Sequence, residues 1–284
     1  MTWIKVGGPA EYLFIPENKE DLITFLKQYP AEQPKTIIGA GSNLLIRDGG
    51  IPGVVISMKK INKIFKVNEF IYAECGALDM AISRMASKLG ISGLEFLIGI
   101  PGTIGGALKM NAGSYGSEIK DILVNVEVID SSGSIFNVSS KDLKLEYRKN
   151  NSPDNWIFLS CNLKGTQSKE EKIRIKMRKI MNDRKSNQPI NQLTGGSTFK
   201  NPYKMKSWKL IDKAGCRGLA YGKARVSEKH CNFLINNGAA QSSDIENLGE
   251  IVRKKVLRET GVNLEWEIIR IGEKIQNKMD NLYE

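Results

Sequence analysis

Two segments of the chain are rich in glycine and carry polar side chains suited to holding an anion. They read GAGSNLLIRDGG (residues 39–50) and GIPGTIGGALKMNAGSYGSEI (residues 99–119). Glycine lacks a Cβ and tolerates positive φ, so a ligand can approach its backbone and successive N–H groups can converge on negative charge. Together the segments predict a diphosphate held between two loops, with Ser42, Asn43, Ser114 and backbone amides as donors. Taken alone, either segment is also compatible with a plain structural turn.

The spacing of the glycines excludes the two best-known phosphate-binding motifs. Neither segment contains GxGxxG or GxxxxGK[ST], so the Rossmann and P-loop mechanisms do not apply. The four cysteines lie far apart without CxxC spacing, so we predict no metal site and no disulfide framework. The single histidine, His230, is either a general base or a structural residue, and we favour the structural interpretation.

Length and composition indicate a folded protein with more than one domain. The chain has 284 residues, which exceeds the usual size of one hydrophobic core, and its 41% hydrophobic and 26% charged residues are typical of globular proteins. No apolar run approaches the roughly 20 residues that span a bilayer, and the first residues lack a signal-peptide layout. We therefore expect a cytoplasmic protein without membrane insertion.

The net charge of +11 is concentrated in the C-terminal part of the chain. Residues 1–165 contain 18 Lys and Arg against 17 Asp and Glu, whereas residues 166–284 contain 24 against 14. A positive field attracts anions. The basic residues are not interleaved with aromatic ones, and no nucleic-acid reader motif is present, so we predict no nucleic-acid partner. The densest basic run, residues 169–185, is expected to be a largely solvated helix.

Apolar periodicity and turn residues predict helices and hairpins that are mixed along the chain. Helices are expected over residues 17–30, 78–90, 169–185 and 243–260, and strands or hairpins over 36–41, 53–57, 64–76, 122–138, 156–163 and 264–272. The expected details are hairpin turns at Asn68-Glu69 and Ser131–Gly133, a helix face of Leu78, Ile82, Met85 and Leu89, and a capping box at Ser243–Glu246. Because strands and helices do not alternate strictly, the pattern indicates an α+β fold.

Seven motifs, in this order, resemble those of the UDP-N-acetylenolpyruvoylglucosamine reductase (UDP-N-acetylmuramate dehydrogenase) family. They are the two glycine-rich segments, EYR (146–148), GGSTFKNP (195–202), SWKLIDKAGCRG (207–218), VSEKHCNFLIN (226–236) and LEWEIIRIG (264–272). The resemblance runs from about Trp3 to Gly272. It implies a flavoenzyme of bacterial peptidoglycan synthesis, active in cell-wall biogenesis, cell shape and cell division.

The resemblance implies a fold and two cofactors. A two-lobed FAD domain of the vanillyl-alcohol-oxidase type, with lobes over 1–57 and 58–168, would precede a smaller α+β substrate domain over 169–284. NADPH would reduce the FAD, and the small-molecule substrate would be UDP-N-acetylenolpyruvoylglucosamine. The short stretch 203–240 is similar to the subgroup that lacks an extra tyrosine loop, and we expect a monomer. The implied FAD contacts are Gly39, Ala40, Gly41, Ser42, Asn43, Gly99, Ile100, Pro101, Gly102, Thr103, Gly105, Gly106, Asn111, Ala112 and Gly113.

Three residues would act on the substrate's enolpyruvyl ether according to the resemblance. Arg148 and Glu267 would stabilise the developing negative charge, and Ser197 would supply the proton that completes the lactyl ether. The implied substrate contacts are Tyr147, Lys200 and Asn201. Read locally, Arg148 can instead pair with Glu146, Ser197 can belong to a turn, and the pattern around Trp266 does not choose between Glu265 and Glu267.

The sequence departs from the family pattern at several positions. Asn150 stands where serine is common, Lys223 stands where a second glycine is frequent, and the segment before Trp3 is shorter than usual, so the natural start is expected either upstream or without an initial helix. Two other functions stay open. A flavin-dependent oxidase of the same fold would commonly attach FAD through a histidine or cysteine, for which Cys75 is the only nearby thiol, and a basic nucleic-acid-binding protein would bind no flavin.

Overall fold

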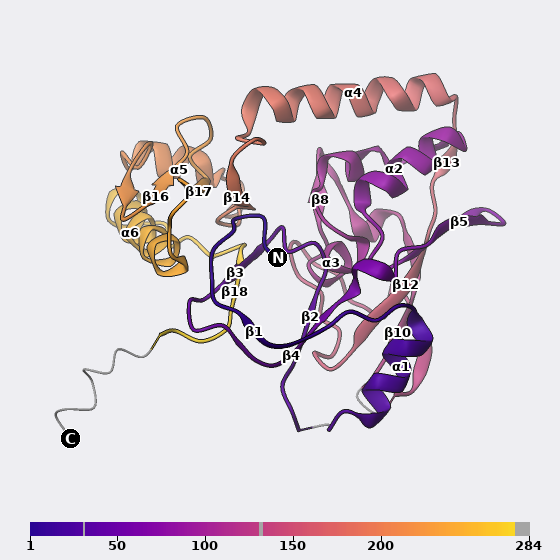
Figure 1. Ribbon diagram of the computed structural model, residues 1–284. Helices are drawn as coiled ribbons and strands as arrows, with labels where there is room; N and C mark the ends of the chain where they lie inside the picture. Colours follow the sequence, from indigo (N-terminus) through magenta and orange to yellow (C-terminus); the bar gives the residue numbers. More distant parts are fainter. Residues whose placement is uncertain (31, 131–132, 276–284) are drawn as a thin grey trace. The chain divides into compact units, whose positions relative to one another are not determined.

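The computed structural model describes residues 1–30, 32–130 and 133–275, and its described part forms two compact units (Figure 1). Unit 1 contains residues 1–12, 41–54 and the chain from Asn187 onward, and unit 2 contains residues 13–40 and 55–186. These units do not coincide with the domains expected at 1–57, 58–168 and 169–284. For example, the first glycine-rich segment is divided, with residues 39–40 in unit 2 and residues 41–50 in unit 1. Those domain limits stay a prediction.

Unit 2 is built on a five-stranded antiparallel sheet with the order β11-β10-β12-β6-β5. Its strands are β5 (Ile64–Val67), β6 (Phe70–Glu74), β10 (Leu123–Ile129), β11 (Ile135–Ser139) and β12 (Ile157–Leu163). The predicted β5–β6 hairpin is confirmed, with Asn68 in its turn at φ 52°. Residues 131 and 132 of the other predicted turn lie outside the described residues.

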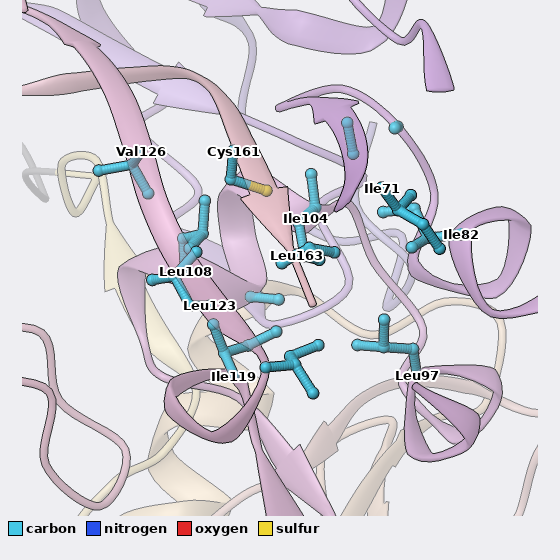
Figure 2. Close-up of a cluster of buried hydrophobic side chains, with 14 of the residues drawn as sticks. Ile71, Ile82, Leu97, Ile104, Leu108, Ile119, Leu123, Val126, Cys161 and Leu163 are labelled. Carbon is cyan, nitrogen blue, oxygen red and sulfur yellow. The ribbon is translucent and has the colours of Figure 1, made fainter. Parts of the chain in front are cut away.

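The hydrophobic core of unit 2 lies between this sheet and two helices, α2 (Asp79–Lys88) and α3 (Ile104–Lys109). Val126, Cys161 and Ala73 face each other across β10, β12 and β6 and are all buried. Figure 2 shows the apolar side chains that meet them, among them Ile71, Ile82, Leu97, Ile104, Leu108, Ile119, Leu123 and Leu163. The core therefore fixes the start of α3, which lies inside the second glycine-rich segment.

The buried face of α2 differs from the predicted one. Leu78 is 53% exposed because it precedes the helix as an extended N-cap residue. The face that is buried consists of Asp79, Ile82, Ser83, Ala86 and Ser87. The helix ends before Gly90, as predicted, and Gly90 has a left-handed φ of 68°.

Two further helices cover unit 2, and both match the sequence-based expectation. Helix α1 (Lys19–Gln28) has Asn18 as its N-cap and buries Leu22 and Leu26. Helix α4 (Glu170–Asn187) carries the basic run and buries Ile173, Met177 and Ile180 against Ile98 and the half-buried Met80. The remaining short elements of this unit are η1 (Met58–Lys60), β7 (Ile91–Ser92), η2 (Glu95–Gly99), β8 (Gly113–Ser114), β9 (Ser117–Glu118), η3 (Ile119–Asp121) and β13 (Thr166–Gln167).

A further sheet has three strands, two of which contain residues assigned to both units. Its order is β1-β4-β2, with β1 (Ala10–Phe14), β2 (Lys35–Ile38) and β4 (Ile51–Ser57). The predicted first strands and helix are therefore present. Within the described residues, no helix combines the length and the hydropathy that a bilayer crossing requires.

Unit 1 packs a four-stranded antiparallel sheet against two helices, α5 (Ser207–Lys213) and α6 (Ser242–Thr260). The sheet order is β14-β17-β16-β15, with β14 (Leu193–Ser197), β15 (Ala220–Tyr221), β16 (Ala224–Val226) and β17 (Phe233–Asn236). A separate parallel pair joins β3 (Leu44–Ile46) to β18 (Ile269–Ile271). The last strand is thus shorter than the predicted 264–272.

Helix α6 has the predicted buried face, but its start differs from the prediction. Ile245, Leu248, Val252 and Val256 are buried, and Gly261 ends the helix at φ 72°. The N-cap is Gln241, which forms a capping box with Asp244, so the expected box at Ser243–Glu246 is wrong. The side chain at position 246 serves another purpose.

Glu246 is the centre of an ion-pair network that ties α6 to β3 and β18. Its carboxylate accepts two 3.0 Å hydrogen bonds from the Arg47 guanidinium and one of 3.2 Å from Arg270. Arg270 also lies 3.3 Å from Glu250, whose carboxylate accepts from the indole N–H of Trp266 at 2.7 Å. The hydrogen bonds from Arg47 lower the pKa of Glu246.

We predict that Glu246→Gln lowers the free energy of unfolding at neutral pH by about 1.5–3 kcal/mol, because hydrogen bonds to a charged group are lost. The carboxylate stabilises the fold above its ordinary pKa of 4.5, and this contribution is lost as the pH falls through the lowered folded-state pKa. Denaturant unfolding of both proteins from pH 7 to pH 3 should therefore show the difference shrinking in acid. Glu259→Gln, which breaks an exposed pair with Arg258 on the same helix, should change stability little at any pH.

Candidate functional site

The two glycine-rich segments meet within unit 2 at Gly39 and Thr103. A Cβ on Gly39 would lie 2.1 Å from the Thr103 hydroxyl oxygen, so no other residue fits there without displacement. Thr103 is buried, and its hydroxyl has no hydrogen-bond partner among the residues that the structure describes. Leaving a buried hydroxyl unpaired costs about 1–3 kcal/mol. An unpaired hydroxyl beside a position that has no room for a side chain is compatible with a phosphate of a dinucleotide.

The glycines of the second segment have two different physical explanations. A Cβ on Gly105 would lie 2.8 Å from the Cβ of Cys75, and one on Gly99 would lie 3.0 Å from Ile180, so these two positions are glycine because of packing. A Cβ on Gly106 would approach nothing closer than 3.8 Å. Packing against the rest of the described chain therefore does not explain why position 106 is glycine.

Part of the first segment supports unit 1 directly. The Asp48 carboxylate accepts the N–H groups of Ser242 and Ser243 at 2.8 and 2.9 Å, which satisfies the start of α6. Gly41 adopts φ 66°, and its Cβ would lie 2.8 Å from the carbonyl oxygen of Met1. The end of this loop is thus a structural turn, as the local alternative proposed.

Arg148 is held against the second glycine-rich segment. Its guanidinium donates a 2.7 Å hydrogen bond to the carbonyl of Gly113 and lies 5.0 Å from the centre of the Tyr147 ring. The carboxylate of Glu146, its local alternative partner, accepts from the Asn151 side chain at 3.1 Å. Arg148 has a left-handed φ of 53°, so the loop holds it in a conformation that few non-glycine residues adopt.

Two asparagines fasten the Arg148 loop to that same segment. The buried Asn111 amide donates to the Glu146 carbonyl at 2.8 Å and to the Glu118 carboxylate at 3.0 Å. Asn150 donates to the Leu108 carbonyl at 2.9 Å. The departure from serine at position 150 therefore supplies a longer donor that reaches across to α3.

Ser197 occupies the last position of β14, where the strand is distorted. Its partner across the sheet is Phe233, and the register shifts between Thr194 and Ser197. Gly196 sits in this shift with φ 84°. The Ser197 side chain is half-buried, and its hydroxyl makes no hydrogen bond to another residue of the described chain. The bulge thus presents a hydroxyl that the surrounding protein does not use.

Glu267 is joined through its main chain to the residue that follows Ser197. The N–H of Glu267 donates to the Thr198 carbonyl at 2.8 Å, and the Glu267 carbonyl accepts from the Asn43 side chain at 3.0 Å. The carbonyl of Asn43 in turn accepts from Ile269 at 3.0 Å. Segments some seventy residues apart in sequence are therefore held side by side in unit 1, together with part of the first glycine-rich loop.

The structure distinguishes the two glutamates that the sequence pattern left equivalent. The Glu265 side chain is exposed and forms a 3.4 Å ion pair with Lys200. Glu267 is half-buried and lies at the junction with Thr198. Its neighbour Trp266 points to α6, where a Cβ on Gly249 would touch the indole ring at 2.2 Å. The two glutamates thus differ in exposure and in partner, and the main chain of Glu267 is the one bonded to the residue that follows Ser197.

The predicted site residues divide between the units. Unit 2 contains Gly39, Ala40, Gly99, Ile100, Pro101, Gly102, Thr103, Gly105, Gly106, Asn111, Ala112, Gly113, Tyr147 and Arg148, and unit 1 contains Gly41, Ser42, Asn43, Ser197, Lys200, Asn201 and Glu267. The Asn201 side chain accepts the N–H of Ser207, the first residue of α5, at 3.0 Å. Burial raises the pKa of the Cys75 thiol well above its usual value, which opposes thiolate chemistry.

His230 has a structural role in unit 1. Burial lowers the pKa of His230, and its Nδ1 atom accepts the N–H of Asn232 at 3.3 Å. Its ring packs edge-on against Phe233 at 4.9 Å. Sequence reasoning did not find Asn232 itself, because its side-chain bonds reach Phe199, 33 positions away, and leave no local periodic signal.

Two family models match separate parts of the chain. A family model described as "FAD binding domain" matches residues 10–139, and one described as "UDP-N-acetylenolpyruvoylglucosamine reductase, C-terminal domain" matches residues 188–271. Among relatives named UDP-N-acetylenolpyruvoylglucosamine reductase, that of Parvibaculum lavamentivorans is 52% identical over 96% of this chain and 88% of its own length. That of Paramagnetospirillum magneticum is 50% identical over 95% and 89%.

The chain belongs to the UDP-N-acetylenolpyruvoylglucosamine reductase family. A solved member, from Thermus caldophilus, superimposes with a TM-score of 0.84 at 34% identity and covers 95% of this chain and 96% of its own. The predicted α+β fold with an FAD-binding domain is confirmed. Like its relatives, this reductase is an FAD-binding oxidoreductase of peptidoglycan precursor synthesis.

The bulge at Gly196 generates a prediction for the reductase. Gly196→Ala should lower the free energy of unfolding by about 1–2 kcal/mol, because the left-handed backbone strains any residue with a Cβ. It should also slow reoxidation of the flavin by bound substrate, because the strain changes the orientation of the Ser197 hydroxyl. Stopped-flow absorbance measures that step, and thermal unfolding measures the first effect.

Gly238→Ala is the matched control. Gly238 also has a left-handed φ, of 98°, and no heavy atom lies within 4 Å of its Cβ position. It should cost similar stability without slowing flavin reoxidation. If both variants slowed flavin reoxidation equally, general destabilisation and not the orientation of Ser197 would be the cause.

Proposed function

We propose that this chain uses NADPH to reduce the enolpyruvyl ether of UDP-N-acetylglucosamine, producing UDP-N-acetylmuramate. Overall, one hydride and one proton add across the carbon–carbon double bond of the ether, and NADPH becomes NADP⁺. When bound, FAD would take the hydride from NADPH and pass it from N5 to the methylene carbon. We retain the prediction that the protein is a cytoplasmic monomer.

The observation that carries this proposal is the junction of the Ser197 and Glu267 segments. Its supporting contact is the 2.8 Å bond from the Glu267 N–H to the Thr198 carbonyl. A hydroxyl with no hydrogen-bond partner among the described residues and a carboxylate side chain from the adjacent segment are the groups that proton delivery requires. The sequence resemblance assigns the same two residues to catalysis.

FAD would be held mainly by backbone groups of the glycine-rich segments in this proposal. The unpaired Thr103 hydroxyl and the uncrowded Gly106 are the observations that fit its diphosphate. The proposed contacts also include Gly39, Ala40, Gly41, Ser42, Asn43 and the segment from Gly99 to Gly113. The Asn111 side chain is fully used within the protein, so its contribution is to brace the Arg148 loop.

The proton and the charge would be handled by three side chains. Ser197 would donate its hydroxyl proton to the carbon beside the substrate carboxylate, because that carbon becomes electron-rich when hydride adds to its neighbour. Glu267 and Arg148 would stabilise the charge that develops there. Arg148 is anchored through Gly113 to the second glycine-rich segment, so the charge on its guanidinium is kept beside the proposed FAD loop.

Substrate binding would use positive and aromatic groups. Lys200, whose ammonium lies 3.4 Å from Glu265, would exchange part of that exposed pairing for a substrate phosphate. Tyr147 is 44% exposed and presents its ring beside Arg148. Asn201 accepts a hydrogen bond through its carbonyl oxygen, and its amide nitrogen would serve as the donor to the substrate.

We predict that Ser197→Ala leaves flavin reduction by NADPH within about twofold of wild type but slows reoxidation by UDP-N-acetylenolpyruvoylglucosamine by about 10²–10³-fold, because only the second step needs the proton. Stopped-flow measurement of flavin absorbance separates the two half-reactions. Ser243→Ala, an exposed hydroxyl at the start of α6, is the control and should affect neither. A comparable loss in both half-reactions of Ser197→Ala would contradict the proton-donor role.

A further inference from the structure

The main chain that follows Ser197 is held by one buried side chain, that of Asn232. Asn232 is 4% exposed and lies in the turn just before β17. Its side-chain oxygen accepts the N–H of Phe199 at 3.0 Å, and its side-chain amide donates to the carbonyl of the same residue at 2.8 Å. Its main-chain carbonyl accepts the N–H of Thr198 at 2.8 Å.

These three bonds replace a strand partner that the sheet does not supply. Regular pairing between β14 and β17 ends at Ser197 and Phe233. Beyond that pair, the amide of Asn232 satisfies both polar groups of the Phe199 main chain, as a neighbouring strand would. The Phe199 side chain is buried and packs on Trp266 at 5.1 Å between ring centres.

We call the three hydrogen bonds between Asn232 and residues 198 and 199 the clamp. The clamp and the hydrogen bond between Glu267 and Thr198 act on opposite sides of the same short segment. Asn232 binds the N–H of Thr198, whereas the carbonyl of Thr198 accepts the N–H of Glu267 at 2.8 Å. Rotation or slippage of residues 198 and 199 would therefore move Ser197 and Glu267 relative to each other. The side chain of Asn232 restricts that rotation through its two bonds to Phe199.

We propose that Asn232 is a positioning residue that fixes the orientation of the Ser197 hydroxyl relative to Glu267. The inference rests on the proposed function, because it takes Ser197 to be the proton donor. A displacement of a donor by about 1 Å can cost on the order of 10²-fold in rate even when the group itself is intact. A purely structural asparagine would instead affect stability and leave the ratio of the two half-reactions unchanged.

Asn236 supplies a matched control on the same strand. It is 5% exposed, and its side-chain amide donates to the carbonyls of Ile4 and Lys5 at 2.9 and 3.3 Å. Its side-chain oxygen accepts the N–H groups of Gly238 and Ala240 at 2.8 and 3.0 Å. The burial is thus comparable, and the Asn236 side chain makes four hydrogen bonds against two for that of Asn232, but none of the Asn236 bonds reaches residues 197–199.

The experiment compares Asn232→Asp with Asn236→Asp in the FAD-loaded full chain. Each substitution keeps the shape of the side chain and replaces the amide donor by a carboxylate oxygen that repels a carbonyl. We expect Asn232→Asp to slow flavin reoxidation by UDP-N-acetylenolpyruvoylglucosamine about 10- to 100-fold while NADPH still reduces the flavin at nearly the wild-type rate. Asn236→Asp should leave the ratio of the two rates unchanged.

Hydrogen exchange provides a readout that does not depend on turnover. The amide of Phe199 should exchange faster in Asn232→Asp than in wild type, and faster still in Asn232→Ala, which removes both side-chain bonds. The same amide should keep wild-type protection in Asn236→Asp. These measurements use folded protein without substrate, so they test the clamp separately from the chemistry.

Several results would overturn the inference. They are an equal loss of both half-reactions in Asn232→Asp, the same selective loss in Asn236→Asp, faster exchange at Phe199 with normal reoxidation, and failure of Asn232→Asp to fold or bind FAD. A wild-type protein that NADPH reduces but the enolpyruvyl substrate does not reoxidise would remove the proposed function and this inference with it. A normal wild type beside an unaffected Asn232→Asp variant would remove the inference alone.

Discussion

The hydrogen bond between the Glu267 N–H and the Thr198 carbonyl is the constraint on which the C-terminal site depends. Neither segment has a long strand of its own at this point, since β14 ends at Ser197 and β18 begins only at Ile269. Their register is set instead by single bonds and by side chains that act as main-chain partners, Asn43 on one side and Asn232 on the other. The main chain of residues 198 and 199 is therefore held in place without a continuous strand ladder.

The glycine-rich segments combine structural and ligand-binding requirements within a few residues. Gly39, Gly99 and Gly105 are restricted by atoms of the protein itself, and Asp48 serves the start of α6. Only Gly106 and the unpaired Thr103 hydroxyl point to something outside the chain. A glycine-rich pattern therefore overstates how many positions contact a cofactor, because close packing of loops against each other selects for the same residue type. The asparagines at 111 and 150 then attach the Arg148 loop to this framework.

Sequence reasoning succeeded where the deciding interactions are local. The buried stripes of α1, α4 and α6 follow from apolar residues spaced three and four apart, and the β5–β6 turn follows from Asn68. It failed where tertiary contacts decide. Leu78 fits the helical period of α2 but precedes the helix, and Asp79, Ser83 and Ser87 occupy the buried face instead. Asp48 meets α6 across 194 positions, and Asn232 meets Phe199 across 33, so neither is visible in any local window. The motifs identified the family, and the structure shows that Glu265 is exposed and paired with Lys200 whereas Glu267 is half-buried, while the catalytic role of Glu267 stays a prediction.

The central proposal is that Ser197 and Glu267 act together on the enolpyruvyl ether of the substrate. The most direct test is a crystal structure of the oxidised holoenzyme with FAD and UDP-N-acetylenolpyruvoylglucosamine bound. In that structure we expect the Ser197 oxygen to lie about 3–3.5 Å from the ether carbon that receives the proton, with the Glu267 carboxylate beside the same group. A bound substrate whose enolpyruvyl group lies out of contact with both side chains would contradict it.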